Sequence, residues 1–281
     1  MARIPNTESF NNEDIIHADE WFDRTRRLTN IPHPANISVD KINTLSSSLP
    51  NVFIQVEPNA IIDNETYLIN NCSKYHTILT YNETIARKCP NAKLYIFGTT
   101  WIPKTYYNSI NTSIKQYKIS TLGGSKLINN SPGHVFRQLI HHNQDKLRDY
   151  PITFFRSERQ KPHITDYGNN PFLTDDKTVL FDTFQFAIII ENSRQTNYAS
   201  EKIMDCVITK TIPIYWGCPN IGSLFDISGW IILESGTIEE LHDKLRILDK
   251  DYYHRYTNAI NKNYDIALKY VDFYDNLNNA V

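Results

Sequence analysis

Short apolar runs alternate along the first part of the chain with longer stretches that have room for helices. The runs at 51–57 (NVFIQVE), 77–81 (TILTY) and 93–99 (KLYIFGT) are rich in β-branched and aromatic residues, which predicts three strands. Before them, the first fifty residues are polar and irregular, with a weak helical pattern at 13–28. Alternation of strands and helices is typical of parallel α/β layers.

A second alternating series begins near residue 117. The run at 184–190 (FQFAIII) is apolar enough for the middle of a parallel sheet. The helical spacing of 134–146 places Val135, Leu139 and Ile140 on one face. Further strands are predicted at 117–122, 152–156, 212–216 and 230–233, and further helices at 200–210, 238–248 and 252–271. A polar segment at 105–116 without an apolar period predicts a boundary between an N-terminal domain, 1–115, and a C-terminal domain, 116–281.

Composition excludes several classes of protein. With 281 residues, of which 41% are hydrophobic and 21% charged, the chain can bury the cores of two ordinary domains. A formal net charge of -2 argues against a dedicated nucleic-acid binder. No apolar stretch approaches the roughly 18 residues of a membrane span, and no apolar segment follows a basic start as in a signal peptide. Four cysteines without C-x-x-C spacing predict reduced thiols, so we expect a cytoplasmic protein.

The segment 186–217 carries the densest candidate chemistry. The chain has no G-x-G-x-x-G and no P-loop, but open α/β sheets bind ligands beyond the carboxyl ends of their strands. Polar side chains follow the strand that ends at residue 190, and they continue to the start of the next predicted helix. They are Glu191, Asn192, Ser193, Tyr198, Ser200, Glu201 and Lys202.

A lysine in the first turn of a helix opposes the helix dipole, and a bound diphosphate would supply a reason for Lys202 to lie there. Ser200 is a plausible N-cap of this helix. Glu201 is placed to accept hydrogen bonds from ribose hydroxyls. Taken alone, Glu201 and Lys202 are better explained as a solvated Glu-Lys pair at a helix start.

The order of motifs in this segment resembles glycosyltransferase family 10, the α-1,3-fucosyltransferases. The chain reads F-x-x-x-x-E-N-S, then Y-x-S-E-K, then I-P-I-x-x-G, where the family has F-E-N-S, Y-x-T-E-K and V-P-V-x-x-G. It departs at Ser200, where the family has Thr, and at Ile190, where the family has Phe. The resemblance implies a GT-B fold, in which two Rossmann-like domains face each other across a cleft. The first domain would hold the acceptor and the second the nucleotide sugar.

Further motifs match the family more loosely but in the same order along the chain, so the resemblance covers roughly residues 50 to 235. In the family a helical Arg holds the donor phosphates, which implies that role for Arg137; Lys126 and Arg156 are alternatives. A guanidinium can contact phosphate in a bidentate way. The stretch 53–58 (FIQVEP) matches the part of the family that carries a Glu at the end of a strand. Glu57 is therefore the candidate general base, against the alternative of a carboxylate that caps a neighbouring loop.

The predicted activity is inverting transfer of one sugar to a hydroxyl of an oligosaccharide or glycoprotein glycan. We expect no cofactor beyond the nucleotide-sugar donor and no metal, because the chain lacks a D-x-D motif and Arg137 and Lys202 can stabilise the leaving diphosphate. The family implies GDP-fucose. The chain is also similar to small glycosyltransferases of large algal viruses, which makes UDP-xylose an alternative donor. A non-catalytic nucleotide-sugar or glycan-binding module on a degenerate transferase fold is the other open class.

Overall fold

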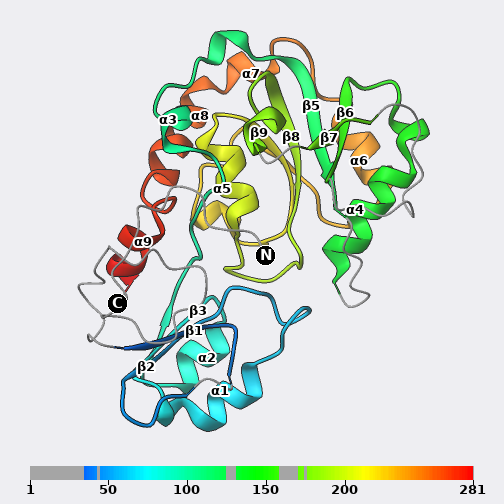
Figure 1. Cartoon of the computed structure of the whole chain (residues 1–281). Helices are drawn as coiled ribbons and strands as arrows, with labels where there is room; N and C mark the ends of the chain where they lie inside the picture. Colours follow the sequence, from blue (N-terminus) through cyan, green and yellow to red (C-terminus); the bar gives the residue numbers. More distant parts are fainter. Residues whose placement is uncertain (1–34, 43–44, 125–130, 158–169, 174–175, 281) are drawn as a thin grey trace.

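The computed structural model describes residues 35–42, 45–124, 131–157, 170–173 and 176–280 (Figure 1). The weak helical pattern at 13–28 and the candidate Lys126 lie outside these residues. Within them, the strands form two sheets, and every strand pairing is parallel.

The first sheet has the order β1-β2-β3-β4, with β1 at Asn36–Val39, β2 at Asn51–Ile54, β3 at Thr77–Thr80 and β4 at Ala92–Leu94. The predicted strands at 51–57 and 77–81 are present in shorter form. The predicted strand at 93–99 was wrong beyond Leu94, because Tyr95 and Phe97 leave the sheet and bury their rings in the core. The sequence analysis missed β1, whose four residues include two polar ones.

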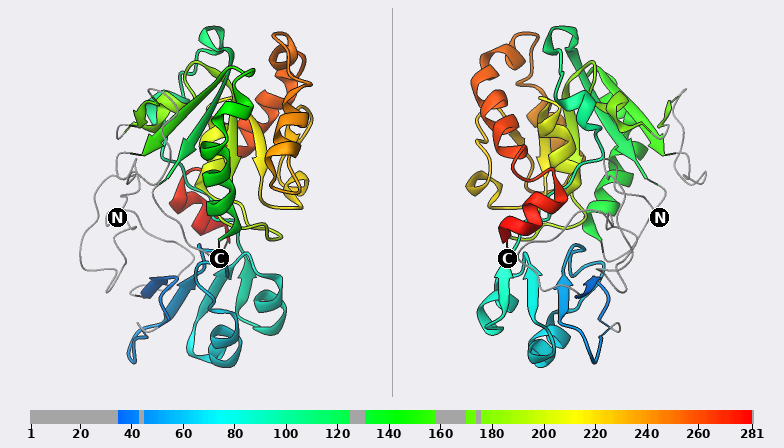
Figure 2. Two further views of the ribbon diagram at one scale, coloured as in Figure 1. Left: turned by 90° about the vertical axis from the view of Figure 1, so that its right-hand side faces the viewer. Right: turned by 60° about the vertical axis from the view of Figure 1, so that its left-hand side comes forward.

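Helices cover both faces of the first sheet (Figures 1 and 2). On one face lie α1, Glu65–Asn71, and α2, Glu83–Lys88, where Leu68 and Ile85 pack on Phe53 and Ile78. On the other lies α9, Phe273–Ala280, the last helix of the chain, which packs in the same core cluster as β1 and β2. The chain therefore returns to its first sheet at its end.

The second sheet has the order β10-β9-β8-β5-β6-β7. Its strands are β5 (Gln116–Gly123), β6 (Ile152–Ser157), β7 (Phe172–Leu173), β8 (Phe184–Ile190), β9 (Ile212–Trp216) and β10 (Ile231–Ile232). The bounds of β8 and β9 are those predicted. Side chains of β8 alternate between two cores, with Ala187 and Ile189 in one and Ile188 and Ile190 in the other.

We call the first sheet with α1 and α2 the first half of the molecule, and the second sheet with its helices the second half. The helices of the second half pack on these two cores. On one side lie α5 (Glu201–Ile208) and α8 (Thr257–Ala267); on the other lie α4 (Pro132–His142), α6 (Ile238–Leu245) and α7 (Tyr252–Arg255). The single helix predicted at 252–271 is thus two helices. A short helix α3, Lys104–Tyr107, precedes β5. Single 3-10 turns occur at Cys72–Lys74, Thr112–Ile114, Gln144–Leu147, Lys177–Leu180 and Ile221–Ser223.

The predicted buried face of α4 was partly wrong. Phe136 and Ile140 are buried, whereas Val135 and Leu139 are 40% and 41% exposed. The reason is that the helix is held through Phe136, whose ring packs edge-on against Trp216. Val135 and Leu139 instead line a groove of about 370 Å³ together with Trp216 and the turn at Gly236.

The two middle strands of the second sheet are β5 and β8, and the chain leaves them toward opposite edges of the sheet. From β5 the chain passes through α4 to β6, while from β8 it passes through α5 to β9. Between two such strands an open parallel sheet has a crevice beyond the carboxyl ends, and ligands bind in that crevice. We therefore expect a ligand beyond the carboxyl ends of β5 and β8.

Candidate active site

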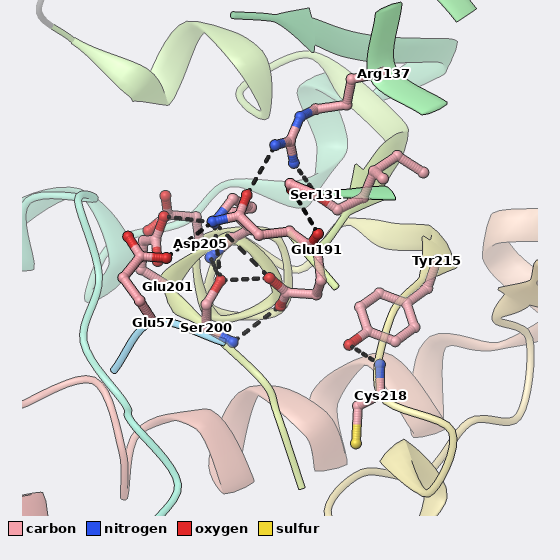
Figure 3. A network of polar contacts seen from close by, with 12 residues as sticks. Glu57, Ser131, Arg137, Glu191, Ser200, Glu201, Asp205, Tyr215 and Cys218 are labelled. Carbon is pink, nitrogen blue, oxygen red and sulfur yellow. Dashed lines mark hydrogen bonds and ion pairs between the residues drawn. The ribbon is translucent and has the colours of Figure 1, made fainter. Parts of the chain in front are cut away.

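Glu191 follows β8 directly and fastens the start of α5 to the end of the strand (Figure 3). Its Oε1 accepts a hydrogen bond of 2.9 Å from the Ser200 backbone N–H, and its Oε2 accepts one of 2.6 Å from the Ser200 hydroxyl. The side chain is fully buried. Burial raises the pKa of Glu191, while Lys202 and the bonds from Ser200 act in the opposite direction. Glu191, which was predicted as a donor-site residue, thus uses both carboxylate oxygens to hold Ser200.

Two glycines let neighbouring backbone approach Glu191. A Cβ at Gly133, in the first turn of α4, would overlap the Glu191 carbonyl oxygen. A Cβ at Gly217, directly after β9, would lie against the Glu191 side chain and the Tyr215 hydroxyl. The start of α4 thereby packs against the backbone of Glu191, and the end of β9 packs against its side chain. Sequence reasoning missed Gly133, although a glycine directly after Pro132 at a helix start is a visible signal.

The first turn of α5 presents a charged pair. Ser200 is its N-cap, as predicted, and accepts a hydrogen bond from the Lys202 backbone N–H. Lys202 Nζ lies 3.1 Å from Glu201 Oε1 and 3.8 Å from Glu191 Oε2. Burial lowers the pKa of Lys202, but Glu201 and Glu191 raise it more, so the net shift is upward. Burial raises the pKa of Glu201, but Lys202 and Lys177 bring it down to about 2.

Both groups are therefore ionised at neutral pH. Their side chains keep 26% and 21% of their surface exposed, for Lys202 and Glu201 respectively, so a ligand can reach them.

Arg137 extends from α4 toward the end of β8. One of its NH groups donates to the Ile190 carbonyl, and NH2 donates to Asn192 Oδ1 at 2.8 Å. Burial lowers the pKa of Arg137, and the nearby Glu191 opposes that shift. The structure thus brings Arg137 to the same strand end as Glu191 and Asn192.

Glu57 approaches these residues from the first sheet. It follows β2, and the backbone N–H groups of Val56 and Glu57 donate to Asp40 Oδ1 and Oδ2 at 2.9 and 3.0 Å. Asp40 itself has a left-handed backbone, with φ of 56°. Asn192 Nδ2 donates to Glu57 Oε2 at 3.3 Å. The carboxylate predicted as a base therefore lies beside the predicted donor residues.

Tyr198 and Ser193, two further predicted donor residues, are buried in the loop between β8 and α5. The Tyr198 ring packs edge-on against Tyr81, with centroids 5.2 Å apart. The Tyr81 hydroxyl lies 3.3 Å from both the Glu57 carbonyl oxygen and Gln195 Oε1. Burial raises the pKa of Tyr198 well above its ordinary value. Sequence reasoning missed Tyr81, which stands directly after β3 and could have been found by its place at a strand end.

Arg156, an alternative to Arg137, lies apart from this group. It belongs to β6, which β5 separates from β8. Its guanidinium lies over the Phe172 ring at 4.2 Å from the centroid and donates to the Asn170 carbonyl at 3.5 Å. Of the two residues, Arg137 is the one that contacts Asn192.

The described residues contain no group of three or more His, Cys, Asp or Glu side chains that could hold a metal ion. His141 is buried against Phe154, with ring centroids 5.5 Å apart. No helix in the described part of the chain has the length and apolar character to cross a membrane.

Comparison with known proteins gives one relative by sequence. Over 108 residues, or 36% of its length, the chain is 29% identical to the α-(1,3)-fucosyltransferase FucT of Helicobacter pylori. The match covers 22% of that protein, so the chain spans about a fifth of the relative's length. No protein-family model matches the chain.

Solved structures resemble the whole fold. The trehalose-6-phosphate synthase OtsA matches with a TM-score of 0.51 and 10% identity, over 82% of this chain and 66% of that one. An α1,3-fucosyltransferase with GDP matches with a TM-score of 0.46 and 13% identity, over 89% of this chain and 73% of that one. The chain thus has an α/β fold of parallel sheets that matches glycosyltransferases of the GT-B type, and it carries a signature like that of glycosyltransferase family 10.

Proposed function

We propose that the protein is an inverting glycosyltransferase that moves one sugar from a nucleoside-diphosphate sugar to a hydroxyl of a glycan acceptor. The observation that carries this proposal is the contact between Glu57 and Asn192, with 3.3 Å between Oε2 and Nδ2. It sets a carboxylate that follows β2 beside the loop that leads from β8 to the Glu201-Lys202 pair. An acid–base group and an anion-binding group therefore share one site.

In this proposal Glu57 takes the proton of the acceptor hydroxyl while that oxygen attacks the anomeric carbon. A positioned base of this kind contributes roughly a hundred- to ten-thousandfold in rate. The bond from the anomeric carbon to the diphosphate oxygen breaks, and the diphosphate leaves toward Arg137 and Lys202. Arg137 has five N–H donors, so those left over from its bonds to Ile190 and Asn192 can bind phosphate oxygens. Glu201 accepts hydrogen bonds from the ribose hydroxyls.

GDP-fucose and UDP-xylose are the two donors we propose to test. The sequence match to an α-(1,3)-fucosyltransferase supports GDP-fucose. The similarity to glycosyltransferases of large algal viruses supports UDP-xylose. Because Arg137 and Lys202 supply positive charge for the diphosphate, we propose that transfer does not need a divalent metal.

A thermal-shift panel of GDP, UDP, GDP-fucose and UDP-xylose, run with and without EDTA, tests the binding part of the proposal. A ligand at about 100 times its Kd adds about 2.7 kcal/mol to stability, a shift of several degrees. Release of free nucleotide from the same donors then tests catalysis. Stabilisation by a donor without hydrolysis or transfer would identify a non-catalytic binding module. No response to any of the four would remove the donor site altogether.

A further inference from the structure

The side-chain amide of Asn192 bridges two groups of opposite charge. Its Oδ1 accepts a hydrogen bond of 2.8 Å from Arg137 NH2. Its Nδ2 donates one of 3.3 Å to Glu57 Oε2. The three side chains form one line of contacts, which runs from Arg137 on α4 to Glu57 in the segment that follows β2.

Only one orientation of this amide satisfies both neighbours. A guanidinium can only donate hydrogen bonds, and an ionised carboxylate can only accept them. Turning the amide over would set N–H groups against Arg137 and an oxygen against Glu57. Asparagine carries its acceptor and its donor on two separate atoms, so it can offer one to each neighbour.

The backbone of Asn192 is held as firmly as its side chain. Its carbonyl oxygen accepts hydrogen bonds from the Ser131 hydroxyl at 2.8 Å and from the Gly133 N–H at 3.1 Å. The residue is 9% exposed. Asn192 is therefore fixed to the start of α4, the helix that carries Arg137, before it reaches Glu57.

We propose that Asn192 is the positioning residue for Glu57: its amide holds Oε2 of the ionised carboxylate and leaves Oε1 to receive the acceptor proton. The inference rests on the proposed function, and it differs from the donor-binding role that the sequence motif suggests. Through the shared amide, the group that binds the leaving diphosphate also orients the base. Hydrogen bonds in such a chain polarise one another, so diphosphate bound at Arg137 acts on the Asn192 contact to Glu57.

Asn192→Asp is the sharpest variant, because it keeps the shape and the acceptor toward Arg137 but replaces the donor toward Glu57 by a negative oxygen. The charged and ionisable groups near Glu57 are Arg137, Lys202, Tyr198 and Tyr81, together with Asp40, which accepts its backbone N–H. A further carboxylate at hydrogen-bond distance disfavours the ionised form of its neighbour. We expect kcat to fall roughly ten- to hundredfold, with a smaller change in KM for the donor. The acid limb of the pH–rate profile should move up by about one pH unit.

Asn197→Asp is the matched control. Asn197 lies in the same loop and also reaches a carboxylate of the first half, with its Nδ2 3.0 Å from Glu83 Oε1. Its left-handed backbone, with φ of 62°, suits Asp as well as Asn. The control should keep the kcat and the pH profile of the parent protein. Equal losses in both variants would overturn the assignment, because they would show a general effect on the loop.

A readout independent of activity separates this inference from the proposed function. In ¹³C NMR of the glutamate carboxyl groups, the titration midpoint of Glu57 should be higher in Asn192→Asp than in the parent and unchanged in Asn197→Asp. An unchanged midpoint in Asn192→Asp overturns the inference, whatever the enzyme does. A shifted midpoint in a protein that neither transfers nor hydrolyses any donor supports the contact and contradicts the proposed function alone.

Discussion

Glu57 and Asn192 are 135 positions apart in the sequence, and they meet with 3.3 Å between Oε2 and Nδ2. The same loop makes further contacts to residues that follow β3: Gln195 approaches the Tyr81 hydroxyl, Asn197 donates to Glu83, and the Tyr198 ring packs against Tyr81. The loop between β8 and α5 thus contacts the segments that follow β2 and β3 in the first sheet. The candidate site is built there from both halves of the chain, and the predictions below separate the contribution of each half.

Glu57→Gln should reduce sugar transfer by roughly a hundredfold or more, because the amide cannot take a proton from the acceptor hydroxyl. Donor binding should change little, since Glu57 hydrogen-bonds to Asn192 and forms no ion pair with a cationic side chain in the described part of the chain. Initial rates with saturating donor, together with donor Kd from calorimetry, measure the two effects separately.

Glu83→Gln is the control for this variant, because Glu83 also accepts a hydrogen bond from an asparagine of the same loop. It should transfer at the parent rate. Full activity in Glu57→Gln would remove Glu57 from the role of base, and a loss in both variants would point to the loop contacts instead.

Lys202→Met should weaken nucleotide binding by roughly ten- to a hundredfold, as expected for the loss of a charged hydrogen-bond donor. The methylene part of the side chain is kept, and the Ser200 cap of α5 does not depend on the ammonium. Titration calorimetry with GDP and UDP measures the change. Lys262→Met, which removes a lysine that is 64% exposed and paired with Asp226, should bind nucleotide like the parent. Unaltered affinity in Lys202→Met would place the diphosphate elsewhere.

The sequence predicted most reliably the elements that local chemistry determines. Strands β8 and β9 have the predicted bounds because their apolar runs are long and end in polar loops. Ser200 caps α5 as predicted, since this bond is made within three residues. Tertiary contacts decided the rest: Tyr95 and Phe97 leave the strand pattern to pack with α9, from the other end of the chain.

In the candidate site, too, local features could be predicted and tertiary contacts could not. The motif placed Glu191, Ser200 and Lys202 at one strand end, but it did not reveal that both Glu191 oxygens are taken up by Ser200. Nor could it show that Asp40 holds the backbone at Glu57 or that Tyr81 meets Gln195. These contacts join segments that are distant in the sequence, and no local pattern encodes them.

Because of Glu201, the free energy of unfolding should depend on pH below about pH 4.3. Burial raises its pKa, but Lys202 and Lys177 bring it to about 2, below the ordinary value near 4.3. The unfolded chain therefore takes up the proton first, so this contribution is complete above about pH 4.3 and is lost as the pH falls toward 2. The free energy of unfolding should fall less steeply over this range in Glu201→Gln than in the parent.

Denaturation in urea between pH 2.5 and 5 measures these slopes. Asp226 and Asp249 also have lowered pKa values, and they contribute equally in both proteins, so the difference isolates Glu201. Lys202→Met provides a second check, because without that ammonium the folded-state pKa of Glu201 lies closer to its ordinary value, so less stability should be lost over this range. Parallel curves for the parent and Glu201→Gln would show that the charged pair adds nothing to the folded state.

Gly133→Ala should destabilise the protein and weaken donor binding together. A Cβ at Gly133 would overlap the Glu191 carbonyl oxygen, so the start of α4 would have to move away from β8. Overpacking of this kind costs about 1–3 kcal/mol, which exceeds the gain of about 1 kcal/mol that alanine normally brings to a helix interior. Arg137 lies one turn further along α4 and would move with it. Gly124→Ala is the control, because its Cβ would meet no described atom within 4 Å. Thermal melts with and without nucleotide compare the two, and equal melting temperatures would show that α4 does not need its close approach to Glu191.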